Sequence, residues 1–213
     1  MRRFVPESAI LSSWGLAAVL LGAGCSTGAG DGRVWGSASL PDCVGDRPDF
    51  DLGVDFFAAD YFDGALLIRL QNGGQSQVFS DGVVIRVEDV EMFADAPGQS
   101  FAVVVEPSIE TFVEQGPDAG VPTTAGDSPA RATLYLNELC PDNSYAFADG
   151  QGEIVFDSIY IPDESKRVRG SFHLEFIDPR DWESPQEPGP WADLFGEFDF
   201  NYSRGSPAQA FPN

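Results

Sequence analysis

Apolar and polar residues alternate along two long segments near the C-terminus. In RVRGSFHLEF, residues 167–176, one face collects Val168, Gly170, Phe172, Leu174 and Phe176. In LFGEFDFNYS, residues 194–203, one face collects Leu194, Gly196, Phe198, Phe200 and Tyr202. A period of two is typical of a strand that buries one face. We therefore expect these segments to form two neighbouring antiparallel strands.

Weaker alternation recurs through the rest of the chain, in residues 33–40, 50–58, 65–71, 82–90, 101–106, 130–137 and 152–161. Turn signals such as Asp63-Gly64, Asp81-Gly82 and Pro97-Gly98 separate these segments. About nine short strands without a helical period predict an all-β fold. We expect a single antiparallel β-sandwich, jelly-roll-like or immunoglobulin-like, with a barrel as the alternative. Residues 107–115 could add one or two helical turns.

Long loops are predicted at residues 115–129 and 178–193, which are rich in Gly and Pro. The sequence contains no internal repeat and no second domain. We expect the folded domain to cover residues 33–213. Binding residues are often carried by long loops on a rigid scaffold.

The N-terminus has the three parts of a secretory signal peptide. Arg2 and Arg3 are followed by a mainly apolar stretch at 9–21 and then by the small residues Gly22, Ala23 and Gly24. The apolar stretch is too short to span a bilayer. We therefore expect residues 1–24 to be a signal peptide that is removed.

Cys25 directly follows this small-residue exit, an arrangement that resembles the lipobox of bacterial lipoproteins. Gly22 occupies the position where that family usually has leucine, and Leu21 lies one place earlier. The resemblance implies that Cys25 carries diacylglycerol and an amide-linked acyl chain such as palmitate, which together attach a protein stably to a membrane. It also implies the outer membrane, because Ser26 stands where aspartate signals retention in the inner membrane. Residues 25–32 are then expected to be a flexible tether.

The protein is strongly acidic, with a net charge of -22 over 213 residues. Without Arg2, Arg3 and Glu7 the mature chain has 10 basic and 33 acidic residues, a net charge of -23. Such a surface repels nucleic acid, so we exclude nucleic acid as a partner. The hydrophobic content of 43% argues against disorder.

The three cysteines are consistent with one lipidated residue and one disulfide. If Cys25 is lipidated, Cys43 and Cys140 remain as a pair in an oxidising compartment. A disulfide between them is the prediction, and two free buried cysteines are the alternative. Neither residue belongs to a CxxC or Cys/His cluster that would indicate zinc.

The sequence offers little support for catalysis. His173 is the only histidine, and the alternation places it on the solvent face with Arg169 and Glu175. No nucleophile elbow, HExxH pair, Walker loop or dinucleotide fingerprint is present. A glycosidase that uses only two carboxylates remains conceivable. We predict that the protein is not an enzyme.

Calcium is the one cofactor that the sequence raises, because hard cations bind to clustered carboxylates. The candidate ligands are Asp60 and Asp63 at one turn and Asp149 and Glu153 near another. None of them matches the spacing of a calcium-binding loop, and a solvated acidic surface explains them equally well.

Trp182 and Trp191 lie in the proline-rich segment 178–193 and are the candidates for ligand stacking. They could stack on sugar rings, or they could cover the end of the core. The leading hypothesis is an outer-membrane lipoprotein that acts without catalysis as a binding or structural component of the cell envelope. The alternative is a carbohydrate-binding or carbohydrate-processing module, with or without calcium. The expected partners are the membrane, reached through the lipid, and an unknown envelope protein or glycan.

Overall fold

The computed structural model describes residues 30–41, 43–74, 80–106, 128–141, 147, 149–178 and 189–202. The predicted signal peptide, Cys25, the predicted helical turns at 107–115 and Trp182 lie outside these ranges. The described residues form ten strands and one short helix: β1 (Gly30–Leu40), β2 (Gly45–Asp51), β3 (Phe56–Phe62), β4 (Ala65–Asn72), β5 (Asp81–Val87), α1 (Val90–Ala94), β6 (Ser100–Val105), β7 (Ala130–Leu136), β8 (Asp149–Ser158), β9 (Arg167–Ile177) and β10 (Trp191–Asn201).

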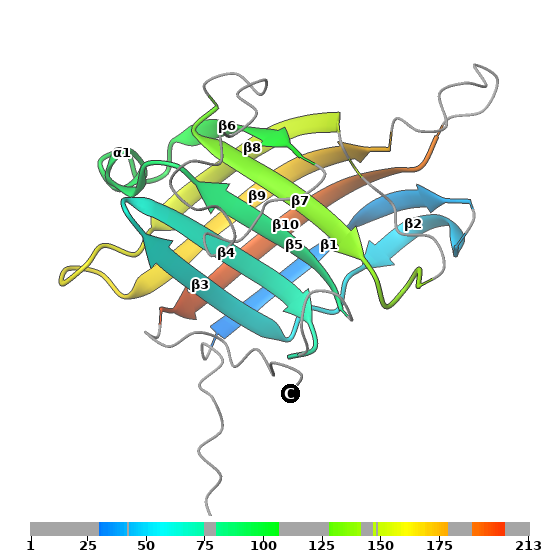
Figure 1. The fold of residues 1–213 in the computed structure, drawn as a ribbon, viewed down its shortest axis with the longest axis horizontal. Helices are drawn as coiled ribbons and strands as arrows, with labels where there is room; N and C mark the ends of the chain where they lie inside the picture. The colour runs from blue at the N-terminus through cyan, green and yellow to red at the C-terminus, as the bar shows by residue number, and fades with distance from the viewer. Residues whose placement is uncertain are drawn as a thin grey trace, which may run out of the picture.

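All ten strands belong to one hydrogen-bonded sheet, in the order β2-β1-β10-β9-β8-β6-β7-β5-β4-β3 (Figure 1). The all-β class is confirmed, but the sheet is mixed rather than purely antiparallel, because β6 and β7 run parallel. Parallel neighbours need a long crossover connection. The chain has one here, since 24 residues separate Val105 from Ala130.

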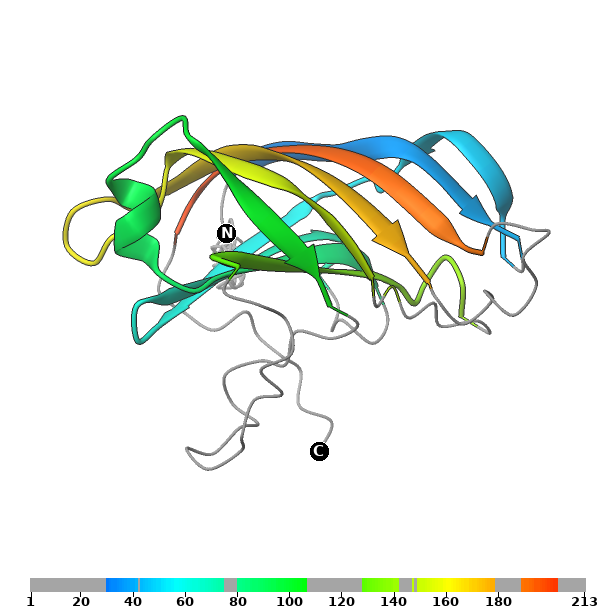
Figure 2. The ribbon, with the colours of Figure 1, turned by 90° about the horizontal axis from the view of Figure 1, so that it is seen from above.

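The sheet curls so that its two halves face each other. Figure 2 shows β1, β10, β9 and β8 in one layer and β3, β4, β5 and β7 in the other, with α1 at one end. Contacts between the layers include Phe57 of β3 and Phe200 of β10, whose ring centroids lie 5.9 Å apart. Side chains from all ten strands join one hydrophobic core between the layers. A sandwich of two separate sheets is not confirmed, because hydrogen bonds run continuously from β2 to β3.

The two C-terminal strands are antiparallel neighbours, as the alternation predicts. Phe172 lies opposite Gly196, and Gly170 lies opposite Phe198. The predicted inner positions in both strands are buried, with Phe172, Leu174, Phe198 and Phe200 each at most 5% exposed. The Phe172 ring lies where a side chain at position 196 would project, so Gly196 makes room for it.

The predicted strand at 50–58 is instead two strands, which makes ten strands rather than nine. Residues 52–55 connect β2, at one edge of the sheet, to β3, at the other edge. Gly53 has a φ of 66°, which favours glycine, and its N–H donates to Oδ1 of Asp51. The N–H of Leu52 bonds to β1 and the N–H of Asp55 bonds to β4, so this connection joins both edges.

Strand β1 begins at Gly30, so the last three residues of the predicted tether lie in the sheet. Gly30 pairs with Phe200 and Gly32 pairs with Phe198. A Cβ at Gly32 would lie 2.7 Å from the Phe57 ring. Gly30 and Gly32 allow close packing here. The sequence alone does not distinguish glycines that are needed for close packing from glycines of a flexible tether.

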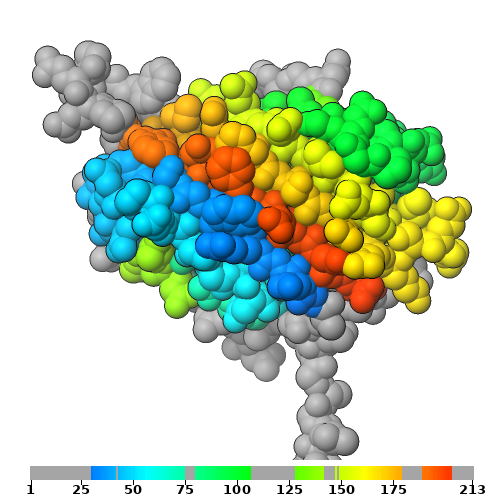
Figure 3. Space-filling model, turned by 180° about the vertical axis from the view of Figure 1, so that it is seen from behind, coloured from blue at the N-terminus to red at the C-terminus, as the bar shows by residue number. Residues whose placement is uncertain are grey.

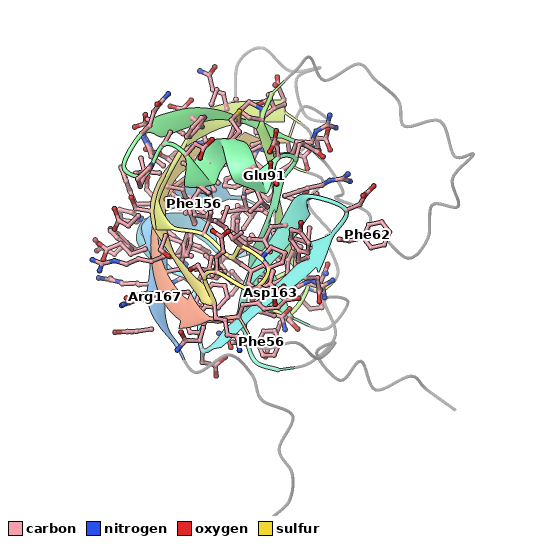
Figure 4. The ribbon with its side chains drawn as sticks, turned by 90° about the vertical axis from the view of Figure 1, so that its left-hand side faces the viewer. Phe56, Phe62, Glu91, Phe156, Asp163 and Arg167 are labelled. Carbon is pink, nitrogen blue, oxygen red and sulfur yellow. A yellow bond between two sulfur atoms is a disulfide. The ribbon has the colours of Figure 1, made fainter. Side chains whose placement is uncertain are left out.

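The segment 82–90 was expected to be a strand throughout, but β5 ends at Val87 and helix α1 follows. Asp89 caps the helix, because its Oδ1 accepts from the N–H of Met92. Phe93 packs beneath it against Phe101 and Phe156. Figure 4 shows Phe156 between the layers. None of the helical segments in the described ranges is long and apolar enough to cross a membrane.

The predicted disulfide between Cys43 and Cys140 is confirmed, with a Cα–Cα distance of 5.4 Å. Cys43 follows β1 in one layer, and Cys140 follows β7 in the other. The turn before Cys140 is held by Asp81, whose Oδ1 accepts from the N–H groups of Glu138 and Leu139. Burial raises the pKa of Asp81 despite these hydrogen bonds. The disulfide therefore links the two layers covalently.

We expect the double variant Cys43→Ala/Cys140→Ala to lose about 2–5 kcal/mol of unfolding free energy. The reason is that the bridge closes a loop of 97 residues and so restricts the unfolded chain. Urea denaturation measures the loss, and the wild-type protein under reducing conditions is the matched control. Equal stability of the oxidised wild type and the double variant would contradict this prediction.

Candidate functional site

The outer surface of β1, β10, β9 and β8 carries the most distinctive group of exposed side chains. Figure 3 looks onto this face, where β1 (blue), β10 (orange), β9 and β8 (yellow) lie side by side. The outer surface of the opposite layer differs, because Leu67, Val84 and Tyr135 form a buried cluster there. Burial also raises the pKa of the Tyr135 hydroxyl.

Three aromatic side chains cross this face in one row, which we call the aromatic row: Trp35 of β1, Phe195 of β10 and His173 of β9. Strand register places Trp35 opposite Phe195 and Phe195 opposite His173. The centroids of Trp35 and Phe195 lie 6.3 Å apart, and those of Phe195 and His173 lie 4.3 Å apart. The His173 and Phe195 rings are nearly parallel, at 8°.

Phe195 is 41% exposed, although it lies in the middle of a sheet face. Two rings stack on Phe195: His173 lies close and nearly parallel, whereas Trp35 lies at 6.3 Å and is tilted by 28°. Phe195 thus presents an exposed apolar surface in a fixed orientation.

His173 is fixed in turn by Asp193, whose Oδ1 lies 2.6 Å from the ring Nε2. A carboxylate can only accept, so Nε2 carries a proton and donates it to this bond. His173 lies on the outer face, as predicted, but its ring is engaged rather than free. An imidazole paired with a carboxylate is also the arrangement of a general base. Within the described residues, however, no hydroxyl or thiol is hydrogen-bonded to the remaining ring nitrogen.

Arg33 closes the other end of the aromatic row. Its guanidinium carbon lies 5.1 Å from the centroid of the Trp35 ring, which is within the range of a cation–π contact. Its Nη2 also lies 3.1 Å from Oδ2 of Asp51 on β2. The ion pair between Arg33 and Asp51 thus holds one end of the row, and the hydrogen bond between His173 and Asp193 holds the other.

Two shallow hollows flank the pair formed by Trp35 and Phe195. The first hollow, of about 330 Å³, lies towards β2 and also involves Arg33, Ser37, Pro48, Asp49, Asp51 and Asp193. The second hollow, of about 310 Å³, lies towards β8 and also involves Glu153, Ser171, His173 and Glu197. Both volumes are at the lower end of the range for small-ligand sites, about 300–1,000 Å³.

Carboxylates surround the aromatic row on both sides. Asp49, Asp51 and Asp193 border the first hollow, and Glu153 and Glu197 border the second. Beyond the second hollow, Asp199 accepts a hydrogen bond of 2.7 Å from Nε of Arg167, which lowers the pKa of that carboxyl below its usual range. The site thus combines an exposed aromatic surface with an acidic border.

The structure separates the residues that the sequence analysis selected. Trp191 begins β10 and lies on the same outer face as Phe195, four positions before it, but it belongs to neither flanking hollow. The four calcium candidates are not brought together, because Asp60 and Asp63 are at β3 and its turn, whereas Asp149 and Glu153 are in β8. Asp60 lies 3.9 Å from Arg69, and Glu153 accepts from Ser100. Among the described residues, no group of three potential ligands could hold a metal ion.

Phe195 and Trp35 are not among the residues that the sequence pattern singled out. The signal was present, because the alternation in β10 places Phe195 on the polar face, with Glu197 and Asp199. Trp35 similarly alternates with Val34 and Gly36, which places it on the other face of its strand. Large aromatic residues on the solvent face of a strand are the informative exception to its pattern. Which strands would bring them together could not be deduced without the pairing order.

No protein-family model matches the chain, and no curated protein or solved structure gives a significant match.

Proposed function

We propose that the protein is a non-catalytic binding component of the cell envelope, and that it binds its ligand with the aromatic row and the two flanking hollows. The observation that carries this proposal is the exposure of Phe195, at 41%, within a row that is otherwise packed and ion-paired. Exposed aromatic patches bordered by polar residues are typical of binding sites. Trp and Arg, both present here, are enriched among residues that dominate binding energy.

The geometry favours binding over catalysis. His173 supports the Phe195 ring and bonds to Asp193, so its described contacts serve to position another side chain. The site lies on paired strands rather than loops, and a rigid surface binds a ligand at a lower entropic cost. We also keep the two-layer sandwich as the proposed packing of the curled sheet, because its layers share one core.

We further propose that Cys25 is lipidated and holds the domain at the outer membrane, as the lipobox resemblance implies. Support comes from the confirmed disulfide, which is typical of proteins outside the cytosol. The domain begins at Gly30, so few residues separate it from the membrane.

We expect a Cys25→Ser variant to leave the membrane fraction of its own cells, because the anchor would be lost while the disulfide-linked domain remains intact. Fractionation followed by immunoblotting measures the shift, and Ser26→Ala is the matched control. A Cys25→Ser protein that still fractionates with membranes would rule out the lipid anchor.

A photo-crosslinking experiment in intact cells tests the binding site. Ser171 borders the second hollow and is exposed, so we would replace it with benzoylphenylalanine in the full chain. Phe62 is the control position, because it is 61% exposed at the end of β3 and points away from the molecule (Figure 4). We expect an adduct from position 171 that disappears in the Phe195→Ala background, and no adduct from position 62.

The Phe195→Ala background removes the exposed ring without touching the core, because Phe195 lies on the outer face. A comparison with Phe62→Ala controls for the loss of an exposed phenylalanine elsewhere. The absence of an adduct from position 171, or an adduct of equal yield in both backgrounds, would contradict the proposed binding site.

A further inference from the structure

We propose that the ligand of this site is an uncharged carbohydrate chain, which stacks one sugar ring on Phe195 and extends into both hollows. The inference rests on the proposed function, since it names the ligand class of the same site. The sugar-binding residues are then Trp35 and Phe195 on the outer face of the sheet, in place of Trp182 and Trp191.

The first argument is the ring surface. One face of a pyranose carries C–H groups that are polarised by the neighbouring oxygens, and the face of an aromatic ring is electron-rich. Phe195 remains 41% exposed, although His173 stacks on it closely and Trp35 stacks on it at 6.3 Å. The contact with His173, and the bond from His173 to Asp193, hold the ring in place before the ligand arrives.

The second argument is the hydrogen-bonding groups beside the ring. A sugar hydroxyl donates well to a carboxylate, and such charge-assisted bonds are stronger than neutral ones. Asp49 and Asp193 border the first hollow next to Phe195. Glu153 and Glu197 border the second. Each hollow therefore combines apolar ring surface with acceptors for hydroxyl groups.

The third argument is the position of the hollows. Trp35 and Phe195 contribute to both, so the two hollows meet at this pair. A single sugar ring on Phe195 would leave part of each hollow unfilled. A chain of several sugar units could pass over the pair and occupy both sides.

The fourth argument is charge, and it restricts the kind of carbohydrate. The mature chain carries a net charge of -23, and carboxylates border both hollows. Arg33 lines the first hollow and contacts Trp35, and it is already paired with Asp51. A uronic acid or a sulfated sugar would meet repulsion here, whereas an uncharged sugar would not.

A protein partner fits these features less well. The centres of protein interfaces are depleted in charged residues. Here carboxylates adjoin the exposed aromatic surface within each hollow. A protein docked on this face would have to supply cations for these carboxylates, since Arg33 is the only Lys or Arg among the described residues that line either hollow.

The test measures binding of defined oligosaccharides to the full mature protein in detergent micelles by titration calorimetry. The probes are uncharged tetrasaccharides of glucose, mannose, galactose and N-acetylglucosamine, together with the uronic acid counterparts of the first three. We expect saturable binding of at least one uncharged probe, at least about tenfold weaker in Phe195→Ala. Phe195→Tyr should retain binding, Phe62→Ala should match the wild type, and the uronic acids should bind more weakly than their uncharged counterparts.

The outcomes separate the ligand class from the binding site. If no uncharged probe binds while the crosslink from position 171 persists and mass spectrometry finds a peptide of another protein in the adduct, the ligand is a protein and only the carbohydrate inference is overturned. If the crosslink also fails, the proposed function falls with it. Tighter binding of uronic acids, or equal binding by Phe195→Ala and the wild type, would also overturn the carbohydrate inference.

Discussion

The structure depends on the burial of one apolar face of a ten-stranded sheet. Strands such as β9 and β10 place large apolar side chains on one side and polar ones on the other. No helix layer covers the apolar side in the described residues, since α1 has only five residues. The sheet therefore covers itself, and the two halves pack against each other around one core. The bridge from Cys43 to Cys140 and the connection at Gly53 hold the two halves in this arrangement.

The packing of the sheet on itself explains the large side chains of the inner face, but not all of those on the outer face. Folding accounts for Phe172, Phe198 and Phe200, which are buried between the layers, but it does not account for Phe195. An aromatic ring that is stacked, backed by a hydrogen-bonded histidine and still 41% exposed gains little from its position in the free protein. A ligand that covers the ring would provide the missing burial. The hollows on either side and their carboxylates indicate what such a ligand must offer.

The alternation in the sequence predicted most of the strands, the pairing of β9 with β10 and the buried faces of both. It could not predict the division of 50–58 into two strands, which depends on a glycine at φ 66° and on contacts to both edges of the sheet. Nor could it predict one sheet rather than two, because strand order is set by non-local pairing. The disulfide followed from counting cysteines. The aromatic row required the register of three strands, so sequence reasoning chose tryptophans in a loop-like segment instead.

Hydroxyl-radical footprinting of the native protein, in intact envelopes and after purification, tests the central claim most directly. If the aromatic row is the ligand-binding surface, Phe195 and Trp35 will oxidise readily in the purified protein and will be protected in the envelope. Phe62 should oxidise equally in both, and the buried Phe198 in neither. Equal oxidation of Phe195 in the two preparations, with protection at Phe62 instead, would contradict the account.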